Sequence, residues 1–327
     1  MYQGKGRVMK SNGGLFTVRM EPTANGAISA PLDGMIVTGR GRGTLHRKGA
    51  LLVGDAVEVS YDATAFSTVD GVTLPAEDGT GLAIDRVIDR KNALIRPPMA
   101  NLDVLFVTLA VASPEPLTET VDKLISIAEF NHIEPVIVIT KCELSPAVAD
   151  ELARIYRLAG FEVFCTGIGM DAALDELRTY VDTRLDKKIA AFSGASGVGK
   201  STLINRLFPG LSLETGELSR RIERGKNTTR IVELYPLSER TESGFLADTP
   251  GFTMLDFERF DFFDKEDLPL TFREFVPYIG ECRYTKCSHT KEEGCAILDA
   301  IRQGKIAKSR HKSFLSLYDV LKKKTKW

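Results

Sequence analysis

Three glycines followed by a lysine form the strongest chemical signal in the sequence. An apolar run over 189–192 precedes them, and a helical pattern over 202–207 follows. Backbone N–H groups can surround phosphate oxygens only where side chains are absent, and a helix N-terminus adds a favourable dipole. The segment satisfies the pattern G-x-x-x-x-G-K-[ST]. It predicts a phosphate-binding loop with the members Gly194, Ala195, Ser196, Gly197, Val198, Gly199, Lys200, Ser201 and Thr202.

A second segment downstream fits the same chemistry. In such a loop Lys200 reaches the β and γ phosphates of a nucleotide, and the Ser201 hydroxyl ligates Mg²⁺. The apolar run 244–247 leads into Asp248-Thr-Pro-Gly251, a D-x-x-G pattern at the end of a predicted strand. Asp248 would hold Mg²⁺ through water, and the N–H of Gly251 would meet the γ phosphate. With Thr229 lying between the two segments, this pattern predicts a nucleotide switch. The alternative is a glycine-rich turn and an ordinary Asp-x-x-Gly turn.

Upstream of the loop, the residues Thr140-Lys141-Cys142-Glu143 follow the apolar run 135–140. They nearly match N-K-x-D, in which a carboxylate accepts two hydrogen bonds from guanine that adenine cannot supply together. Glu143 keeps that carboxylate with one more methylene. Cys165 and Thr166 follow the next predicted strand, where a backbone N–H would meet the guanine carbonyl oxygen. Taken alone, the first segment is more often a plain strand-to-helix turn.

Four potential metal ligands lie close together near the C-terminal end, namely Cys282, Cys287, His289 and Cys295. Three thiolates and one imidazole complete a tetrahedral shell with no position for water, which is typical of a structural metal. The alternative is a set of free cysteines in a small core. Cys142 and Cys165 are interpreted as ordinary cysteines of the nucleotide-binding region.

The elements that position these residues divide the chain into three predicted domains. Residues 1–90 show short β-type stretches, with a hairpin turn at Asn12-Gly13-Gly14, which predicts a small OB-type β-barrel. Residues 91–262 alternate strand-length apolar runs with amphipathic helical patterns, which predicts an α/β domain with parallel strands and helices on both faces. Residues 263–327 are predicted to form a helical metal-binding domain that ends in a basic helix over 308–324.

Composition and charge limit the class of protein. The chain has 327 residues, 43% of them apolar, and a net charge of −1. These values argue against disorder and a fibrous protein. We find no membrane-length apolar run and no signal-peptide core, and therefore expect a cytoplasmic protein with no membrane partner. Residues 1–50 carry a net charge of +6 and residues 302–327 carry +8, so the middle carries −15. Two basic ends favour the interpretation that they bind a polyanionic partner such as RNA. The alternative is that each is only a solvent-exposed charged surface.

The order of the motifs distinguishes this chain from ordinary GTPases, in which base recognition comes last. Here it precedes the P-loop. With a barrel ahead and a Cys/His cluster behind, the chain closely resembles the circularly permuted family known as small-ribosomal-subunit-dependent GTPase A. The segment 224–230 and the D-x-x-G region carry the resemblance further. The resemblance implies a GTP hydrolase that acts late in small-subunit maturation and binds rRNA through both flanking domains. It also implies that the small subunit stimulates GTP hydrolysis.

The resemblance also implies cofactors and catalytic residues. The Cys/His cluster would hold one structural Zn²⁺, while Mg²⁺ would be held with GTP by Ser201, Thr229 and Asp248. The catalytic set would be Lys200, Asn227, Thr229, Asp248 and Gly251. Three positions depart from the family pattern, since Thr140 and Glu143 replace Asn and Asp, and Asn227 replaces a His proposed to assist hydrolysis. Two alternatives are a non-catalytic, nucleotide-gated RNA-binding module and a P-loop ATPase or kinase. We expect a monomer.

Overall fold

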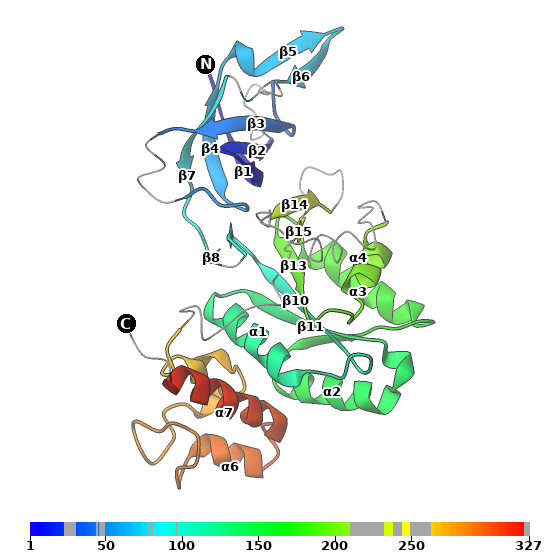
Figure 1. Cartoon of the computed structure of the whole chain (residues 1–327), viewed down its shortest axis with the longest axis vertical. Coiled ribbons are helices and arrows are strands. Elements are labelled where there is room, and N and C mark those ends of the chain that lie inside the picture. The colour runs from blue at the N-terminus through cyan, green and yellow to red at the C-terminus, as the bar shows by residue number, and fades with distance from the viewer. Residues whose placement is uncertain are drawn as a thin grey trace. The chain divides into compact units, whose positions relative to one another are not determined.

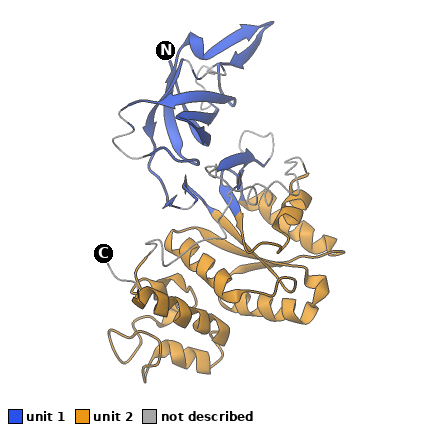
Figure 2. Ribbon diagram, viewed as in Figure 1, with its two compact units in different colours: residues 1–103, 185–191, 216–251 blue, residues 104–184, 192–215, 252–327 orange. Residues whose placement is uncertain are grey.

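The structure is a computed structural model of the whole chain, and its contacts divide the chain into two compact units (Figures 1 and 2). It describes residues 1–22, 31–43, 45, 50–76, 79, 81–95, 97–209, 232–237, 244–248 and 263–323. Unit 1 comprises residues 1–103, 185–191 and 216–251, and unit 2 comprises residues 104–184, 192–215 and 252–327. The predicted division into three domains, at residues 90 and 262, remains a prediction.

Unit 1 contains a closed five-stranded barrel, which confirms the predicted N-terminal barrel. Its strands run in the order β1 (Tyr2–Asn12), β2 (Leu15–Met20), β3 (Ile36–Gly41), β7 (Leu82–Val87) and β4 (Ala56–Tyr61), and β4 pairs back to β1. All pairings are antiparallel except that of β3 with β7. Alternate side chains fill the interior, because successive residues of a strand point to opposite faces.

The predicted hairpin turn joins the first two strands. Asn12 pairs with Leu15, and the two residues between them, Gly13 and Gly14, have φ angles of 57° and 81°. Positive φ at both central residues is what a two-residue turn between twisted strands demands. The turn was therefore placed correctly, but both positive angles belong to glycines and neither belongs to Asn12. A second hairpin, β5 (Phe66–Val69) and β6 (Val72–Pro75), was not anticipated.

Further strands of unit 1 lie outside the barrel. β15 (Phe245–Asp248) pairs in parallel with the first residues of β13 (Ile189–Ser193) and antiparallel with β14 (Glu233–Pro236). The pairing of Lys10 with Glu233 joins β14 to β1 and includes a 2.8 Å ion pair. A short pair, β8 (Ala93–Leu94) and β9 (Met99–Ala100), follows the barrel. β14, β8 and β9 were absent from the sequence-based prediction.

Unit 2 contains the predicted alternation of parallel strands and helices. Strands β10 (Val104–Ala110), β11 (Glu134–Thr140) and β12 (Glu162–Cys165) are parallel neighbours. Helices α1 (Thr118–Phe130), α2 (Pro146–Leu158) and α3 (Asp171–Arg184) alternate with them. Every residue of β10 is buried, as expected where helices cover both faces of a sheet. The carboxyl ends of parallel strands share one edge, so the loops that follow β10, β11 and β12 gather there.

The described C-terminal part of unit 2, residues 263–323, consists of turns, short 3-10 helices and two α-helices. The α-helices are α6 (Ala296–Arg302) and α7 (Lys308–Lys323), and α7 packs against α1 (Figure 1). Regular helix covers less of this region than predicted, because the loop around the cysteine cluster takes up much of its length. Among the described residues, no helix is both long and apolar enough to cross a membrane.

Candidate functional site

The predicted phosphate-binding loop lies between strand β13 and helix α4 (Lys200–Leu207). Gly194, Gly197 and Gly199 all have positive φ angles, which side-chain-bearing residues rarely adopt. At Gly194 there is also no room, since a Cβ atom there would lie 2.1 Å from the carbonyl oxygen of Thr108. Helix α4 begins two residues earlier than predicted, which places Lys200 and Ser201 in its first turn.

The loop closes around the Lys200 ammonium. Its Nζ donates hydrogen bonds to the carbonyl oxygens of Gly194 at 2.7 Å and of Ala195 at 2.8 Å. Burial disfavours the charged form and lowers the pKa of Lys200 to about 8. Ser201 is half-buried and Thr202 is exposed. The arrangement provides a cation held by backbone carbonyls beside a helix N-terminus, which suits the binding of phosphate oxygens.

The end of β11 is hydrogen-bonded directly to this loop. The hydroxyl of Thr140, a side chain only 5% exposed, donates to the carbonyl oxygen of Val198 at 2.6 Å and to that of Leu109 at 3.2 Å. Lys141 has a left-handed backbone, with φ of 57°, and its Nζ donates to the carbonyl oxygens of Gly197, at 2.8 Å, and Ser113. The predicted base-recognition segment and the predicted phosphate loop are therefore in contact, although 56 residues separate Lys141 from Gly197.

The exposed carboxylate of Glu143 lies against the loop that follows β12. Its Oε2 accepts a hydrogen bond from the N–H of Ile168 at 3.1 Å, and a Cβ atom at Gly167 would lie 2.1 Å from the same oxygen. Thr166 is held from both sides, because its N–H donates to the Ile139 carbonyl at 2.7 Å and its own carbonyl accepts from the Cys142 N–H at 3.1 Å. The two predicted base-recognition loops are thus in contact.

Cys142 and Cys165 lie in these two loops, and the Cys142 thiol donates to the Ile139 carbonyl at 3.4 Å. The neighbouring Cys142 thiol lowers the pKa of Cys165 to about 7, with a further contribution from the positive charge of Arg157. The neighbouring Cys165 thiol, together with burial, raises the pKa of Cys142. The interpretation of both as ordinary cysteines of the nucleotide-binding region remains a prediction.

Arg206 in α4 is a site residue that the sequence analysis missed. Its guanidinium donates to the Gly167 carbonyl at 3.2 Å and to the carboxylate of Asp171 at 2.8 Å. The Arg206 carbonyl in turn accepts from Arg178 of α3 at 3.0 Å. Arg206 connects the helix that follows the phosphate loop to the base-recognition loop. No motif marks it, because any long basic side chain on that helix face could make the same contact.

The predicted switch region is described only in part. Asp248 is half-buried and is the last residue of β15. The D-x-x-G pattern predicts its metal-binding carboxylate at such a strand end. Asn227, Thr229 and Gly251, predicted to be catalytic, lie outside the described residues, as does the segment 224–230. Their roles remain predictions.

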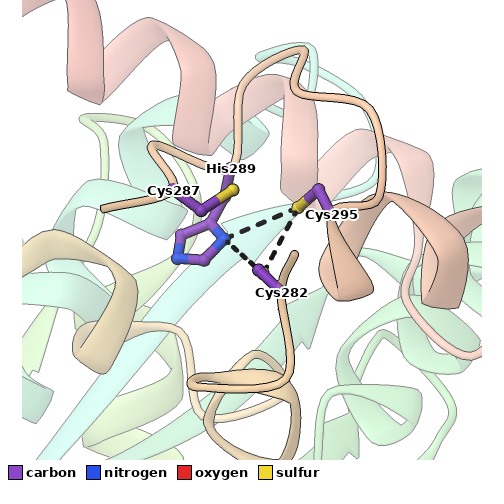
Figure 3. A group of neighbouring side chains, drawn as sticks. All are labelled: Cys282, Cys287, His289 and Cys295. Carbon is purple, nitrogen blue, oxygen red and sulfur yellow. Dashed lines mark hydrogen bonds between the residues drawn. The ribbon is translucent and has the colours of Figure 1, made fainter. Parts of the chain in front are cut away.

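The Cys/His cluster comes together as the sequence predicts (Figure 3). The four ligand atoms of Cys282, Cys287, His289 and Cys295 all lie within 4.8 Å of one another. The Sγ atoms of Cys282 and Cys295 are 3.9 Å apart, and each is 3.5 Å from His289 Nδ1. Tetrahedral Zn²⁺, with Zn–S bonds of about 2.3 Å and Zn–N bonds of about 2.0 Å, requires separations of about 3.8 and about 3.5 Å. The donor set therefore fits a structural zinc ion.

Neighbouring groups hold the cluster in shape. The Glu292 carboxylate accepts backbone hydrogen bonds from Ser288 at 2.8 Å and from Thr290 at 3.0 Å, which folds the loop between the ligands. The Cys282 sulfur accepts the N–H of Ala296 at 3.4 Å. His311 of α7 contacts the His289 carbonyl through Nε2 at 2.8 Å. Such outer hydrogen bonds orient metal ligands and favour the thiolate form.

A buried ion-pair network attaches this region to α1. Arg310 of α7, 1% exposed, donates to Asp122 of α1 at 2.5 Å and to Glu274 at 2.7 Å. The Tyr156 hydroxyl contacts the same Asp122 oxygen at 3.2 Å. Removal of one partner of such a network leaves an uncompensated buried charge, which typically costs about 3–5 kcal/mol. Helix α7, whose His311 contacts the cluster at the His289 carbonyl, is therefore fixed to the α/β part of unit 2.

Comparisons with known proteins agree with this picture. A family model described as RsgA GTPase matches residues 87–258. A protein of Caldanaerobacter subterraneus subsp. tengcongensis named small ribosomal subunit biogenesis GTPase RsgA is 36% identical over 293 residues, covering 89% of this chain and 90% of that protein. A protein of the same name from Agathobacter rectalis is 34% identical over 324 residues, covering 98% of this chain and 99% of that protein.

Two solved structures are similar over nearly the whole chain. One is described as YloQ, a circularly permuted GTPase, with a TM-score of 0.72, 26% identity and coverage of 100% of this chain and 97% of that one. The other is YjeQ from Thermotoga maritima, with a TM-score of 0.73, 27% identity and coverage of 99% and 100%.

Proposed function

The chain belongs to the RsgA GTPase family, and from this membership and the site described above we propose that it hydrolyses GTP during maturation of the small ribosomal subunit. One structural observation supports the guanine-nucleotide site most directly. Thr140 and Lys141, which precede the phosphate loop in the chain, donate hydrogen bonds to its carbonyl oxygens at Val198 and Gly197. A permuted GTPase needs this contact. Its base-recognition segment precedes the phosphate loop in the chain, and the two must lie side by side to bind the base and the phosphates of the same nucleotide.

In this proposal the residues of unit 2 bind and orient the nucleotide. Lys200 exchanges its contacts with loop carbonyls for the β and γ phosphates, and the loop N–H groups surround the phosphate oxygens. Glu143 accepts hydrogen bonds from the guanine N1–H and exocyclic amine, a pair of donors that adenine lacks. The loop at Thr166 to Ile168, already in contact with Glu143, provides backbone N–H groups for the guanine carbonyl oxygen.

The hydroxyl of Ser201 and the carboxylate of Asp248 are oxygen donors of the kind that Mg²⁺ prefers. The sequence pattern adds Thr229 to this set. The ion, when bound with GTP, neutralises charge on the β and γ phosphates. Asn227 stands where the family usually has His, and its amide can orient a water molecule but cannot act as a base near neutral pH. We therefore propose that contact with the small subunit completes the positioning of the attacking water.

The flanking regions provide the contacts with the ribosomal subunit. The barrel and the C-terminal helix carry the two basic ends of the chain, which suit rRNA phosphates. The Cys/His cluster, loaded with one Zn²⁺, maintains the fold of the C-terminal region. We place the protein in the cytoplasm and expect it to act as a monomer that binds GTP and GDP.

The test is a comparison of GTP and ATP turnover by the full chain, with and without purified small ribosomal subunits. We expect GTP to be preferred and its hydrolysis to be accelerated by subunits. Lys200→Ala abolishes the acceleration, whereas Lys265→Ala, a change outside the site, leaves it intact. Equal turnover of ATP would contradict the guanine assignment. Nucleotide-dependent subunit binding without any hydrolysis would favour a non-catalytic, nucleotide-gated RNA-binding module.

A further inference from the structure

Three charged residues lie in register on three neighbouring strands of unit 1. Lys10 of β1 pairs with Glu233 of β14, and Glu233 pairs in turn with Asp248 of β15. Both pairings are antiparallel, and residues directly opposite one another on antiparallel strands have their side chains on the same face, with Cβ atoms about 4.5–5.5 Å apart. A row of one positive and two negative charges therefore crosses the sheet and ends at the carboxylate predicted to hold Mg²⁺.

Glu233 is placed between an attractive and a repulsive neighbour. Its Oε2 lies 2.8 Å from the Lys10 Nζ, and the Glu233 and Lys10 side chains are 31% and 37% exposed. Like charges directly opposite each other on a sheet are destabilising, so the carboxylates of Glu233 and Asp248 repel each other, and the charge of Lys10 offsets this repulsion in part. Because both side chains of the ion pair are partly exposed, solvent and salt weaken these interactions without abolishing them.

A second contact attaches the barrel to the other end of β15. The guanidinium carbons of Arg7 and Arg19 each lie 5.8 Å from the centroid of the ring of Phe245, the first residue of β15. Arg7 and Arg19 are themselves paired across β1 and β2. Because this contact does not involve Lys10, β15 keeps an attachment to the barrel when the ion pair of Lys10 with Glu233 is changed. The charges of that pair can therefore be varied to test what they do at Asp248.

We propose that Glu233 and Lys10 set the affinity of Asp248 for the Mg²⁺ bound with the nucleotide, with Glu233 raising that affinity and Lys10 lowering it. Neither residue ligates the ion, and both act through their charge, from one and two strands away. A negative charge beside Asp248 attracts a divalent cation, and a positive charge behind it partly cancels that attraction. The inference rests on the proposed function, in which Asp248 holds Mg²⁺ through water.

The experiment measures the affinity of the full, zinc-loaded chain for a fluorescent, hydrolysis-resistant GTP analogue over a series of free Mg²⁺ concentrations. The Mg²⁺ concentration at half-maximal effect reports the affinity for the ion, binding in EDTA gives the reference without it, and urea unfolding checks the fold. We expect Glu233→Gln to raise this concentration roughly threefold and Lys10→Gln to lower it roughly twofold, because charges one and two strands away are partly screened. The opposite signs are the distinguishing feature, since a merely structural ion pair is broken by either change.

An exchange of the two charges provides a second test. Lys10→Glu combined with Glu233→Lys keeps an ion pair between β1 and β14 but places the positive charge next to Asp248. We expect the exchanged protein to need roughly twofold more Mg²⁺ than the parent, because the nearer charge dominates. Glu58→Gln is the matched control, since it removes the same charge from a barrel ion pair, with Arg86 at 2.7 Å, that does not involve β14 or β15. It should leave the Mg²⁺ dependence unchanged.

Two kinds of failure give different results. Shifts in the same direction for Glu233→Gln and Lys10→Gln, parent-like Mg²⁺ dependence of the exchanged protein, or an equal shift in Glu58→Gln would overturn the inference. A parent protein whose nucleotide affinity does not depend on Mg²⁺ would instead contradict the proposed magnesium site, and this inference with it.

Discussion

The hydroxyl of Thr140 holds the phosphate loop to the end of β11, so its removal by Thr140→Val tests how the site is assembled. Valine keeps the shape of threonine and the buried packing but cannot donate the hydrogen bonds to Val198, at 2.6 Å, and Leu109, at 3.2 Å. A buried acceptor that loses its donor typically costs about 1–3 kcal/mol. β11 is buried along nearly its whole length, so the strand stays in place and the loop takes most of the change. We expect about 1.4 kcal/mol to appear in nucleotide binding, which is about a tenfold rise in Kd.

The assay is equilibrium binding of a fluorescent GDP analogue, with urea unfolding measured on the same samples. Thr140→Ser keeps the hydroxyl and should bind nearly as the parent does. Thr183→Val is the matched control, because the Thr183 hydroxyl donates to Thr179 at 2.7 Å within the exposed face of α3, in a helix-internal contact. A Thr140→Val protein that binds GDP like the parent and unfolds at the same urea concentration would refute the reasoning that this hydroxyl positions the loop.

Four further predictions concern the rest of the molecule. Glu143→Ala should weaken GTP binding by about 1–3 kcal/mol without strengthening ATP binding, because guanine donors lose their acceptor; equal affinity of the unmodified protein for GTP and ATP would contradict this. Cys287→Ser should lose the one bound zinc and lower the melting temperature, since zinc binding contributes to folding, and metal analysis with a thermal melt checks both. Neutralising lysines 322–324 should weaken small-subunit binding and flatten its salt dependence while leaving GTP affinity unchanged, because fewer counterions are released; an unchanged slope would mean that these lysines are only solvated. Asn227→Ala should reduce subunit-stimulated turnover modestly and Asn227→His should preserve or raise it, whereas an isolated protein that hydrolyses GTP as fast as it does with saturating subunits would show that the ribosome does not complete the site.

Local patterns were sufficient wherever one short stretch of chain determines its own structure. The apolar runs 135–140 and 189–192 lie within β11 and β13, and the predicted basic helix 308–324 nearly coincides with α7, because the spacing of apolar residues records which face is buried. The P-loop was predictable for the same reason, as its glycines, lysine and hydroxyl are consecutive. The four potential metal ligands were predictable because their spacing in sequence already allows them to meet.

Other features could not be predicted, because they depend on partners far away in the chain. β14 has four residues and only mixed burial, and it becomes a strand through pairing with β15 and β1. Arg310 belongs to a basic helix pattern that suggests a solvated side chain, yet it is buried against Asp122 and Glu274. A charged residue can be buried only where opposite charges meet it, and those charges come from α1 and from the segment before the metal cluster.

Residue order alone was enough to select the groups that could do chemistry, namely the predicted phosphate loop, the predicted base-recognition segment in its permuted order and the four potential metal ligands. Those properties depend on residue type and short spacing. Which side chains and loops meet became visible only in the folded chain, including Thr140 with the phosphate loop, Arg206 with Gly167, and Cys142 with Thr166. Each of these contacts joins segments whose proximity comes from parallel strand register and helix packing, and those arise from burial of the whole apolar surface rather than from any local pattern.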